Sequence, residues 1–135
     1  MKKKLLTTIP VVLVLLLGGC IGTKGGLKKQ AEGTGASRTF EHGYNDVAKA
    51  TRRAIVNSGL AIDEASQVAP GKLAIIAKKD SGRFSYGELV RVIVQELSEQ
   101  RTQVEIITKK RVKLNVLAKG DWSQTIFSNI ELELQ

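Results

Sequence analysis

The chain has 135 residues and a formal net charge of +8, and this length suits one domain. It contains one Cys and one His, so it cannot form an intramolecular disulfide, and it lacks the several His and Cys ligands typical of metal sites. The positive charge is concentrated before residue 40, because residues 40–135 hold 14 basic and 12 acidic side chains. That near balance argues against a nucleic-acid partner.

The first nineteen residues have the composition of a secretory signal. Lys2, Lys3 and Lys4 precede a mostly apolar stretch, in which the fully apolar run over residues 11–17 is seven residues long. A helix that spans a bilayer needs about 20 apolar residues, so this segment is too short for a stable span. A short apolar core between a basic start and small residues is typical of a signal peptide.

The end of this segment, Leu17-Gly18-Gly19-Cys20, resembles the lipobox of bacterial lipoproteins, in which an apolar residue and two small residues precede a Cys. The resemblance implies that residues 1–19 are removed. It also implies that the Cys20 thiol receives a diacylglyceryl group and that its new amino group receives a further acyl chain such as palmitate. Two or more chains hold a protein stably on a membrane. The alternative is an ordinary secretory signal that happens to end at a Cys.

Residue 21 is Ile, whereas an Asp at this position commonly retains lipoproteins at the inner membrane of Gram-negative cells. The resemblance therefore implies the outer membrane, with the domain facing the periplasm, if the cell has one. Residues 20–39 are expected to be the lipidated Cys followed by a flexible tether, because they are rich in Gly and polar residues. As a coil, the nineteen residues Ile21–Thr39 would reach about 22–26 Å. The lysines of the tether would contact anionic headgroups or serve solubility alone.

Residues 40–135 are predicted to form one domain that begins with a helix over residues 45–58. Apolar positions three and four residues apart place one face of this helix toward a core. Asn45 is the expected N-cap. Gly59 followed by Leu60 predicts a glycine stop in which an apolar residue folds back onto the last turn.

Alternating apolar residues then predict strands at 60–63, 73–77, 88–97 and 103–108, with Ala69-Pro70-Gly71 and Asp80-Ser81-Gly82 as turns. The alternation resumes at Val112, Leu114 and Val116, so residues 103–118 form either one long strand or two. Asp63-Glu64 is expected to end a strand. Short turns favour an antiparallel meander of three to four strands.

Helical spacing returns after residue 121. Asp121 and Gln124 have the separation of a capping box. Bulky apolar residues recur every four positions, at Trp122, Ile126, Ile130 and Leu134. The alternative is a strand over residues 130–134, where Ile-Glu-Leu-Glu-Leu alternates. The favoured fold is a two-layer α+β domain, with both helices on one face of the sheet. The element order, Ala54…Gly59-Leu60 and Asp121-Trp122-Ser123 together resemble small envelope lipoproteins of unknown function; this resemblance implies a fold and a location only.

No catalytic constellation, cofactor motif or metal-ligand cluster occurs in the sequence, so we expect no enzyme, no cofactor and no metal. His42 has no evident nucleophile as a partner and is expected at the surface before the first helix. Asp80 and Glu88 flank a loop, but nothing beyond composition pairs them as a glycosidase dyad.

Two segments are candidates for binding. The basic run Lys109, Lys110, Arg111 and Lys113 would meet phosphates of lipid or cell-wall polymer, or would only protect an exposed strand from aggregation. The loop residues Arg83, Phe84 and Tyr86 would contact a protein, or the aromatic rings would pack on the sheet. The function expected from the sequence is a membrane-anchored envelope lipoprotein with a noncatalytic domain that binds or scaffolds a periplasmic or membrane protein. The alternative is a binder of anionic lipid or cell-wall polymer.

Overall fold

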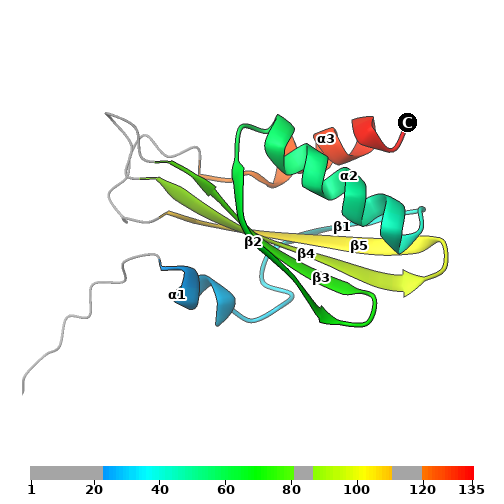
Figure 1. Cartoon of the computed structure of the whole chain (residues 1–135), viewed down its shortest axis with the longest axis horizontal. Coiled ribbons are helices and arrows are strands. Elements are labelled where there is room, and N and C mark those ends of the chain that lie inside the picture. Colours follow the sequence, from blue (N-terminus) through cyan, green and yellow to red (C-terminus); the bar gives the residue numbers. More distant parts are fainter. Residues whose placement is uncertain (1–22, 81–86, 111–119) are drawn as a thin grey trace, which may run out of the picture.

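The computed structural model of the protein describes residues 23–80, 87–110 and 120–135. Within these residues five strands form one antiparallel sheet in the order β1-β5-β4-β3-β2 (Figure 1). The elements in chain order are α1 (Lys24–Lys28), β1 (Ala36–Phe40), α2 (Tyr44–Asn57), β2 (Ala61–Ala69), β3 (Lys72–Lys79), β4 (Glu88–Ser98), β5 (Arg101–Lys110) and α3 (Ser123–Glu133).

The predicted α+β class is confirmed. Helices α2 and α3 pack against each other on one face of the sheet, and β2 to β5 form the expected meander of antiparallel neighbours (Figure 1). The sheet has one strand more than predicted, because β1 adds to the outer edge of β5 in antiparallel register, with Ala36 opposite Ile106 and Phe40 opposite Thr102.

Helix α2 matches the predicted helix to within one residue at each end. The expected cap is wrong, because Gly43 occupies the N-cap position without a side-chain hydrogen bond and Asn45 lies inside the first turn. The glycine stop is confirmed: Gly59 has a φ of 82°, and the N–H of buried Leu60 donates to the carbonyl of Ile55. Only glycine adopts such a φ readily, so the chain can turn sharply from α2 into β2.

The hairpin at residues 70–71 and the strand boundaries of β3 and β4 agree closely with the prediction. Strand β2 is longer than expected, and Asp63-Glu64 lies near its start instead of its end, where a register irregularity interrupts pairing with β3. Strand β5 ends at Lys110, and the predicted continuation at Val112, Leu114 and Val116 lies outside the described residues.

The C-terminal segment is a helix, so the alternative of a strand at residues 130–134 is wrong. The predicted capping box does not form, because Trp122 takes the N-cap position; the Asp121 carboxylate instead accepts a hydrogen bond from the Ser123 N–H at 2.8 Å. The bulky stripe packs as expected, with Trp122, Ile126 and Ile130 buried and Leu134 half-buried.

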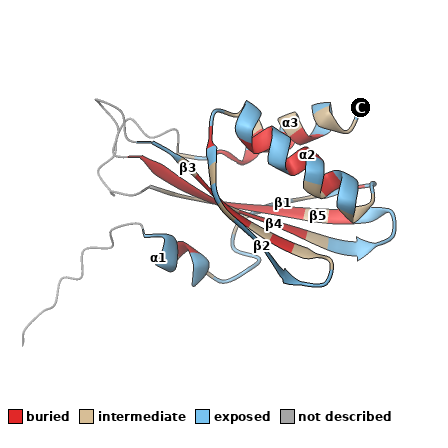
Figure 2. Ribbon diagram, in the orientation of Figure 1, coloured by how far each residue is buried: buried red, intermediate tan, exposed pale blue. Residues whose placement is uncertain are grey.

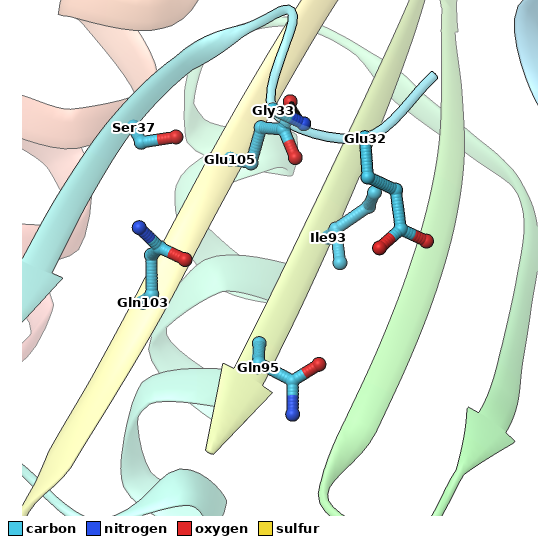
Figure 3. A pocket seen from close by; sticks show the side chains of 7 residues that line it. All are labelled: Glu32, Gly33, Ser37, Ile93, Gln95, Gln103 and Glu105. Carbon is cyan, nitrogen blue, oxygen red and sulfur yellow. Dashed lines mark hydrogen bonds between the residues drawn. The ribbon is translucent and has the colours of Figure 1, made fainter. Parts of the chain in front are cut away.

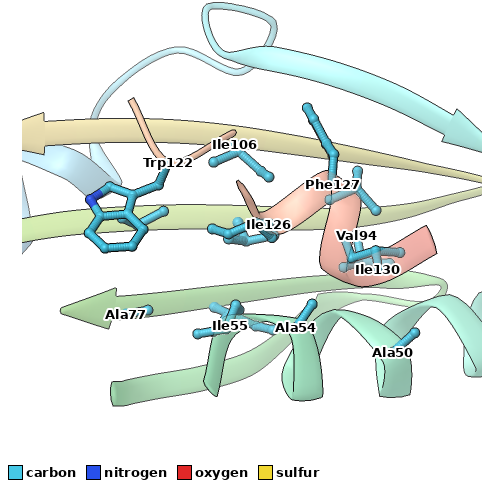
Figure 4. Close-up of a cluster of buried hydrophobic side chains, with 14 of the residues drawn as sticks. Ala50, Ala54, Ile55, Ala77, Val94, Ile106, Trp122, Ile126, Phe127 and Ile130 are labelled. Carbon is cyan, nitrogen blue, oxygen red and sulfur yellow. The ribbon is translucent and has the colours of Figure 1, made fainter. Parts of the chain in front are cut away.

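The main core lies between the sheet and the α2–α3 layer (Figures 2 and 4). Alternate residues of β3, β4 and β5 form the sheet side of this core, and the buried faces of α2 and α3 form the helix side. Fully buried members include Ile55, Ile75, Val92, Val104 and Ile126. The residues between them on the same strands point to the opposite face of the sheet, since side chains alternate along a strand.

The prediction that residues 21–39 form a flexible tether is wrong for residues 23–39, which the structure describes. Residues 24–28 form α1 and residues 36–40 form β1, so the folded domain begins well before residue 40. Helix α1 lies on the face of the sheet opposite α2 and α3 (Figure 1). The polar, Gly-rich composition indicated a coil, but long-range contacts hold this segment on the sheet.

Candidate binding surface

The face of the sheet that α2 and α3 leave uncovered is crossed by residues 23–35, here called the N-terminal strap. Its helix α1 begins at Thr23, whose hydroxyl accepts a hydrogen bond from the Gly26 N–H at 3.0 Å. Leu27 is 0% exposed and forms a satellite cluster with Ile76 of β3, Leu89 of β4 and Ile107 of β5. One apolar side chain therefore docks α1 on three neighbouring strands.

Ion pairs flank this apolar contact. The Lys24 ammonium lies 2.6 Å from the Asp63 carboxylate, and the Lys28 ammonium lies 2.7 Å from the Glu64 carboxylate. Both acids sit at the irregular start of β2, so this irregularity presents them to α1. Exposed pairs of this kind contribute little stability each, but they orient the helix on the sheet.

A hydrogen bond from Lys24 lowers the pKa of Asp63, and the same contact raises the pKa of Lys24. Because the pKa of Asp63 is lowered, ionised Asp63 stabilises the folded state at pH values above the usual 3.8. This stabilisation is lost as the pH falls through the shifted pKa. Because the pKa of Lys24 is raised, charged Lys24 stabilises the folded state at pH values below the usual 10.5. This stabilisation is lost as the pH rises through the shifted pKa. The pair is therefore intact between these two values.

We expect the Asp63 carboxyl carbon to titrate below 3.8 in an NMR pH series. Lys24→Gln removes the donor and should move the midpoint up toward that value, although Lys78 still lies 3.5 Å from Asp63. Lys29→Gln is the matched control, because Lys29 makes no ion pair with another described residue, and it should leave the midpoint in place. A midpoint at or above 3.8 in the unsubstituted protein would show that Lys24 does not dock on Asp63.

Further along the strap, Glu32 lies over the middle of the sheet. Its carboxylate pairs with Lys72 of β3 and lies 3.8 Å from the guanidinium of Arg91 of β4. Arg91 also donates to the carbonyl of Gln30 at 3.0 Å. These contacts hold the strap where it turns from β4 toward β5.

Glu105 of β5 also binds the strap, from the sheet beneath it. It is 7% exposed, and one of its carboxylate oxygens accepts hydrogen bonds from the N–H groups of Gly33 at 2.7 Å and Gly35 at 2.9 Å. A buried carboxylate is costly unless it is paired or hydrogen-bonded, and the strap supplies these donors. A Cβ at Gly35 would lie 2.5 Å from the Ile106 carbonyl oxygen, so only glycine permits this approach.

The strap leaves two hollows on the open face, one on each side of it. The first, here called the polar hollow, measures about 160 Å³ (Figure 3). It is lined by Glu32, Gly33, Ser37, Ile93, Gln95, Gln103 and Glu105. The second hollow measures about 240 Å³ and lies toward the exposed edge strand β2, between Lys28, Glu64, Val68 and Arg91.

Two carboxylates line the polar hollow, but Glu32 is paired with Lys72 and Arg91, and Glu105 accepts hydrogen bonds from the strap. The remaining polar groups of the lining are neutral. Gln95 and Gln103 are directly opposite in the β4–β5 register, and Ser37 lies on the neighbouring β1 (Figure 3). Amides and hydroxyls both donate and accept hydrogen bonds, and the buried side chain of Ile93 adds an apolar patch. These groups suit a polar ligand such as a peptide, and they supply no nucleophile–base pair.

Most residues singled out from the sequence lie outside the described residues: Leu17, Gly18, Gly19, Cys20, Arg83, Phe84, Tyr86, Arg111 and Lys113. Lys110 belongs to β5, and Lys109 lies on the open face, where its ammonium is 3.2 Å from the position of a Cβ on Gly26. The structure therefore places Lys109 beside α1. Sequence reasoning missed Leu27, Glu32 and Glu105; a polar residue in the middle of a strand was the one signal for Glu105.

The other candidates for chemistry have structural environments. His42 is exposed, and its carbonyl accepts a hydrogen bond from the Thr102 hydroxyl. Glu88 is buried and accepts from the Gly120 N–H at 3.1 Å, whereas Asp80 is exposed. Within residues 23–80, 87–110 and 120–135, no three His, Cys, Asp or Glu side chains are grouped as metal ligands.

The sequence matches no protein-family model and no curated protein. Among the helices of the described ranges, none has the length and apolar character needed to cross a bilayer.

Proposed function

We propose that the protein is a membrane-anchored envelope lipoprotein whose noncatalytic domain binds or scaffolds a protein partner. The observation that carries this proposal is the Leu17-Gly18-Gly19-Cys20 motif, which the folded domain follows after only a few residues. Acylation of Cys20 anchors the mature chain, in the outer membrane of a Gram-negative cell, with the domain in the periplasm. The chain acts there without a cofactor or a nucleic-acid partner.

The polar hollow supports the binding part of the proposal. Its amides and hydroxyl match the donors and acceptors of a peptide backbone, and the strap contacts described above keep one side of it in place. The opposite face of the sheet is covered by α2 and α3. The hollow of about 290 Å³ between these two helices has a mostly charged lining that includes Asp46, Arg53 and Glu133, so it matches a peptide backbone less well.

A second candidate function is binding of anionic lipid or cell-wall polymer through the basic run at Lys109, Lys110, Arg111 and Lys113. The position of Lys109 beside α1 favours it, because the chain enters the domain there.

Protein extracted from its host tests the proposal in two measurements. The intact mass should show loss of residues 1–19 and gain of acyl chains, and Cys20→Ser should abolish both the gain and recovery in the membrane fraction. A photo-crosslinking residue at Gln95 should then give an adduct with a second protein in intact cells. The same residue at Arg52, which is exposed on α2, is the matched control and should give none.

Unacylated protein in the soluble fraction would contradict the anchor. Acylated protein that gives only the monomer band from Gln95 would contradict the partner and leave the anchor in place.

A further inference from the structure

The docked strap brings the lipid-bearing residue close to one end of the sheet. Three peptide links separate Cys20 from Thr23, the N-cap of α1. Even fully extended, they span at most about 11 Å. This length is close to the Debye length of about 8–10 Å at physiological ionic strength, so charges around α1 act on the bilayer surface.

That end of the sheet is basic. One cross-strand row contains Ala61, Lys78, Leu89 and Lys109, and α1 packs beside it because Leu27 clusters with Leu89. We define the basic end as α1 and this row with the lysines around them: Lys24, Lys28, Lys29, Lys78, Lys79 and Lys109. The exposed or half-exposed acids near them are Asp63, Glu64, Asp80 and Asp121, which are fewer than the six lysines, so positive charge is in excess.

The lysines of the basic end are not equally available. Lys24 and Lys28 pair with Asp63 and Glu64, so their charges are largely compensated. The Lys79 ammonium donates to the Gly59 carbonyl at 3.1 Å, at the end of α2 and not beside α1. Lys29 and Lys109 form no ion pair with another residue in the described part of the chain. A lysine near an anionic surface attracts it whether or not it makes a fixed contact, so these two should contribute most.

The other end of the sheet lies beyond the reach of this field. The turn that joins β4 and β5 is at residues 99–100, and residues 90–98 of β4, nine in all, separate it from the Leu89 row. At about 3.3 Å per residue this is about 30 Å, about three Debye lengths. The domain therefore has an end that senses the bilayer and an end that does not.

We propose that the docked strap holds the basic end of the domain against anionic headgroups of the membrane that carries the anchor. The inference rests on the lipid anchor proposed above. It assigns the membrane surface as the partner of the basic end, and it leaves the β4–β5 turn and the adjacent part of the polar hollow facing away from the bilayer.

Single thiols can test this orientation, because acylation consumes the only Cys. Mature lipidated protein carrying Ala61→Cys at the basic end, or Gln100→Cys at the far turn, is labelled with a fluorophore. It is then bound to vesicles of phosphatidylethanolamine and phosphatidylglycerol that contain a headgroup quencher. We expect strong quenching at position 61 and little at position 100. Lys29→Gln and Lys109→Gln should each lower the ratio of quenching at position 61 to quenching at position 100 by up to about fivefold.

Lys49→Gln with Arg52→Gln on the exposed surface of α2 is the matched control and should leave the ratio unchanged. Vesicles of phosphatidylcholine alone should give the ratio of the lysine variants. Protein that does not sediment with vesicles would overturn the anchor, and with it this inference. Protein that sediments but shows equal quenching at positions 61 and 100 would overturn the orientation alone.

Discussion

Ile126→Ala should lower the free energy of unfolding by about 2–5 kcal/mol. Ile126 is 0% exposed and belongs to the main core with Ile55 and Ile106 (Figure 4). Truncation removes apolar contacts and leaves a cavity, because α3 is held between α2 and the sheet and cannot collapse fully into the space. A domain of this size has a total stability of about 5–15 kcal/mol, so the loss would be a large fraction of it.

Chemical denaturation monitored by the single Trp would measure this change. Trp122 is buried beside α3, so its fluorescence reports loss of the core. Leu132→Ala is the matched control in the same helix, since Leu132 is 65% exposed and should change stability by no more than about 0.5 kcal/mol. Equal losses for the two variants would show that α3 does not pack through the Ile126 side.

The elements that the sequence predicts well are those in which periodicity and burial coincide. Val90, Val92 and Val94 alternate along β4 and all face the main core, and the four-residue spacing of Trp122, Ile126 and Ile130 gives the buried stripe of α3. The caps were less predictable, because Asn45 and Asp121 have the right chemistry but the helices begin one residue away from the expected start.

The strap could not be predicted in the same way. Gly25, Gly26, Gly33 and Gly35 read as linker residues, yet Gly35 is needed because the strap approaches the backbone of Ile106 too closely for any side chain. Glu105 reads as a solvent-facing position of a strand, but its carboxylate is covered by the strap that it binds. The structural role of each residue depends on a contact with a residue about 70 positions away along the chain.

This difference changes the expected behaviour of an anchored domain. A tether of nineteen residues would let the domain move about 22–26 Å from its lipid. With the strap docked, only three links remain, so the reach falls to about 11 Å. How firmly the strap is docked therefore sets how closely the domain is held to the bilayer.

Leu27→Ala should raise the rate of trypsin cleavage after Lys28 and Lys29 by about 30-fold or more. Both lysines are exposed, but a protease needs the backbone around them to leave the sheet, so cleavage follows the population of the open strap. Leu27 is the only residue of the strap that is apolar, large and fully buried within the described chain. Loss of a buried Leu side chain typically costs about 2–5 kcal/mol, and 2 kcal/mol corresponds to a factor of about 30.

Ile126→Ala supplies the control that separates local from global opening. It weakens the main core on the other face of the sheet and leaves the contacts of Leu27 with Ile76, Leu89 and Ile107 unchanged. If the strap opens by itself, cleavage after Lys28 should stay near the unsubstituted rate in Ile126→Ala and rise only in Leu27→Ala. Parallel acceleration in both variants would mean that the strap leaves the sheet only when the whole domain unfolds, and the strap would then be as permanent a part of the fold as β1.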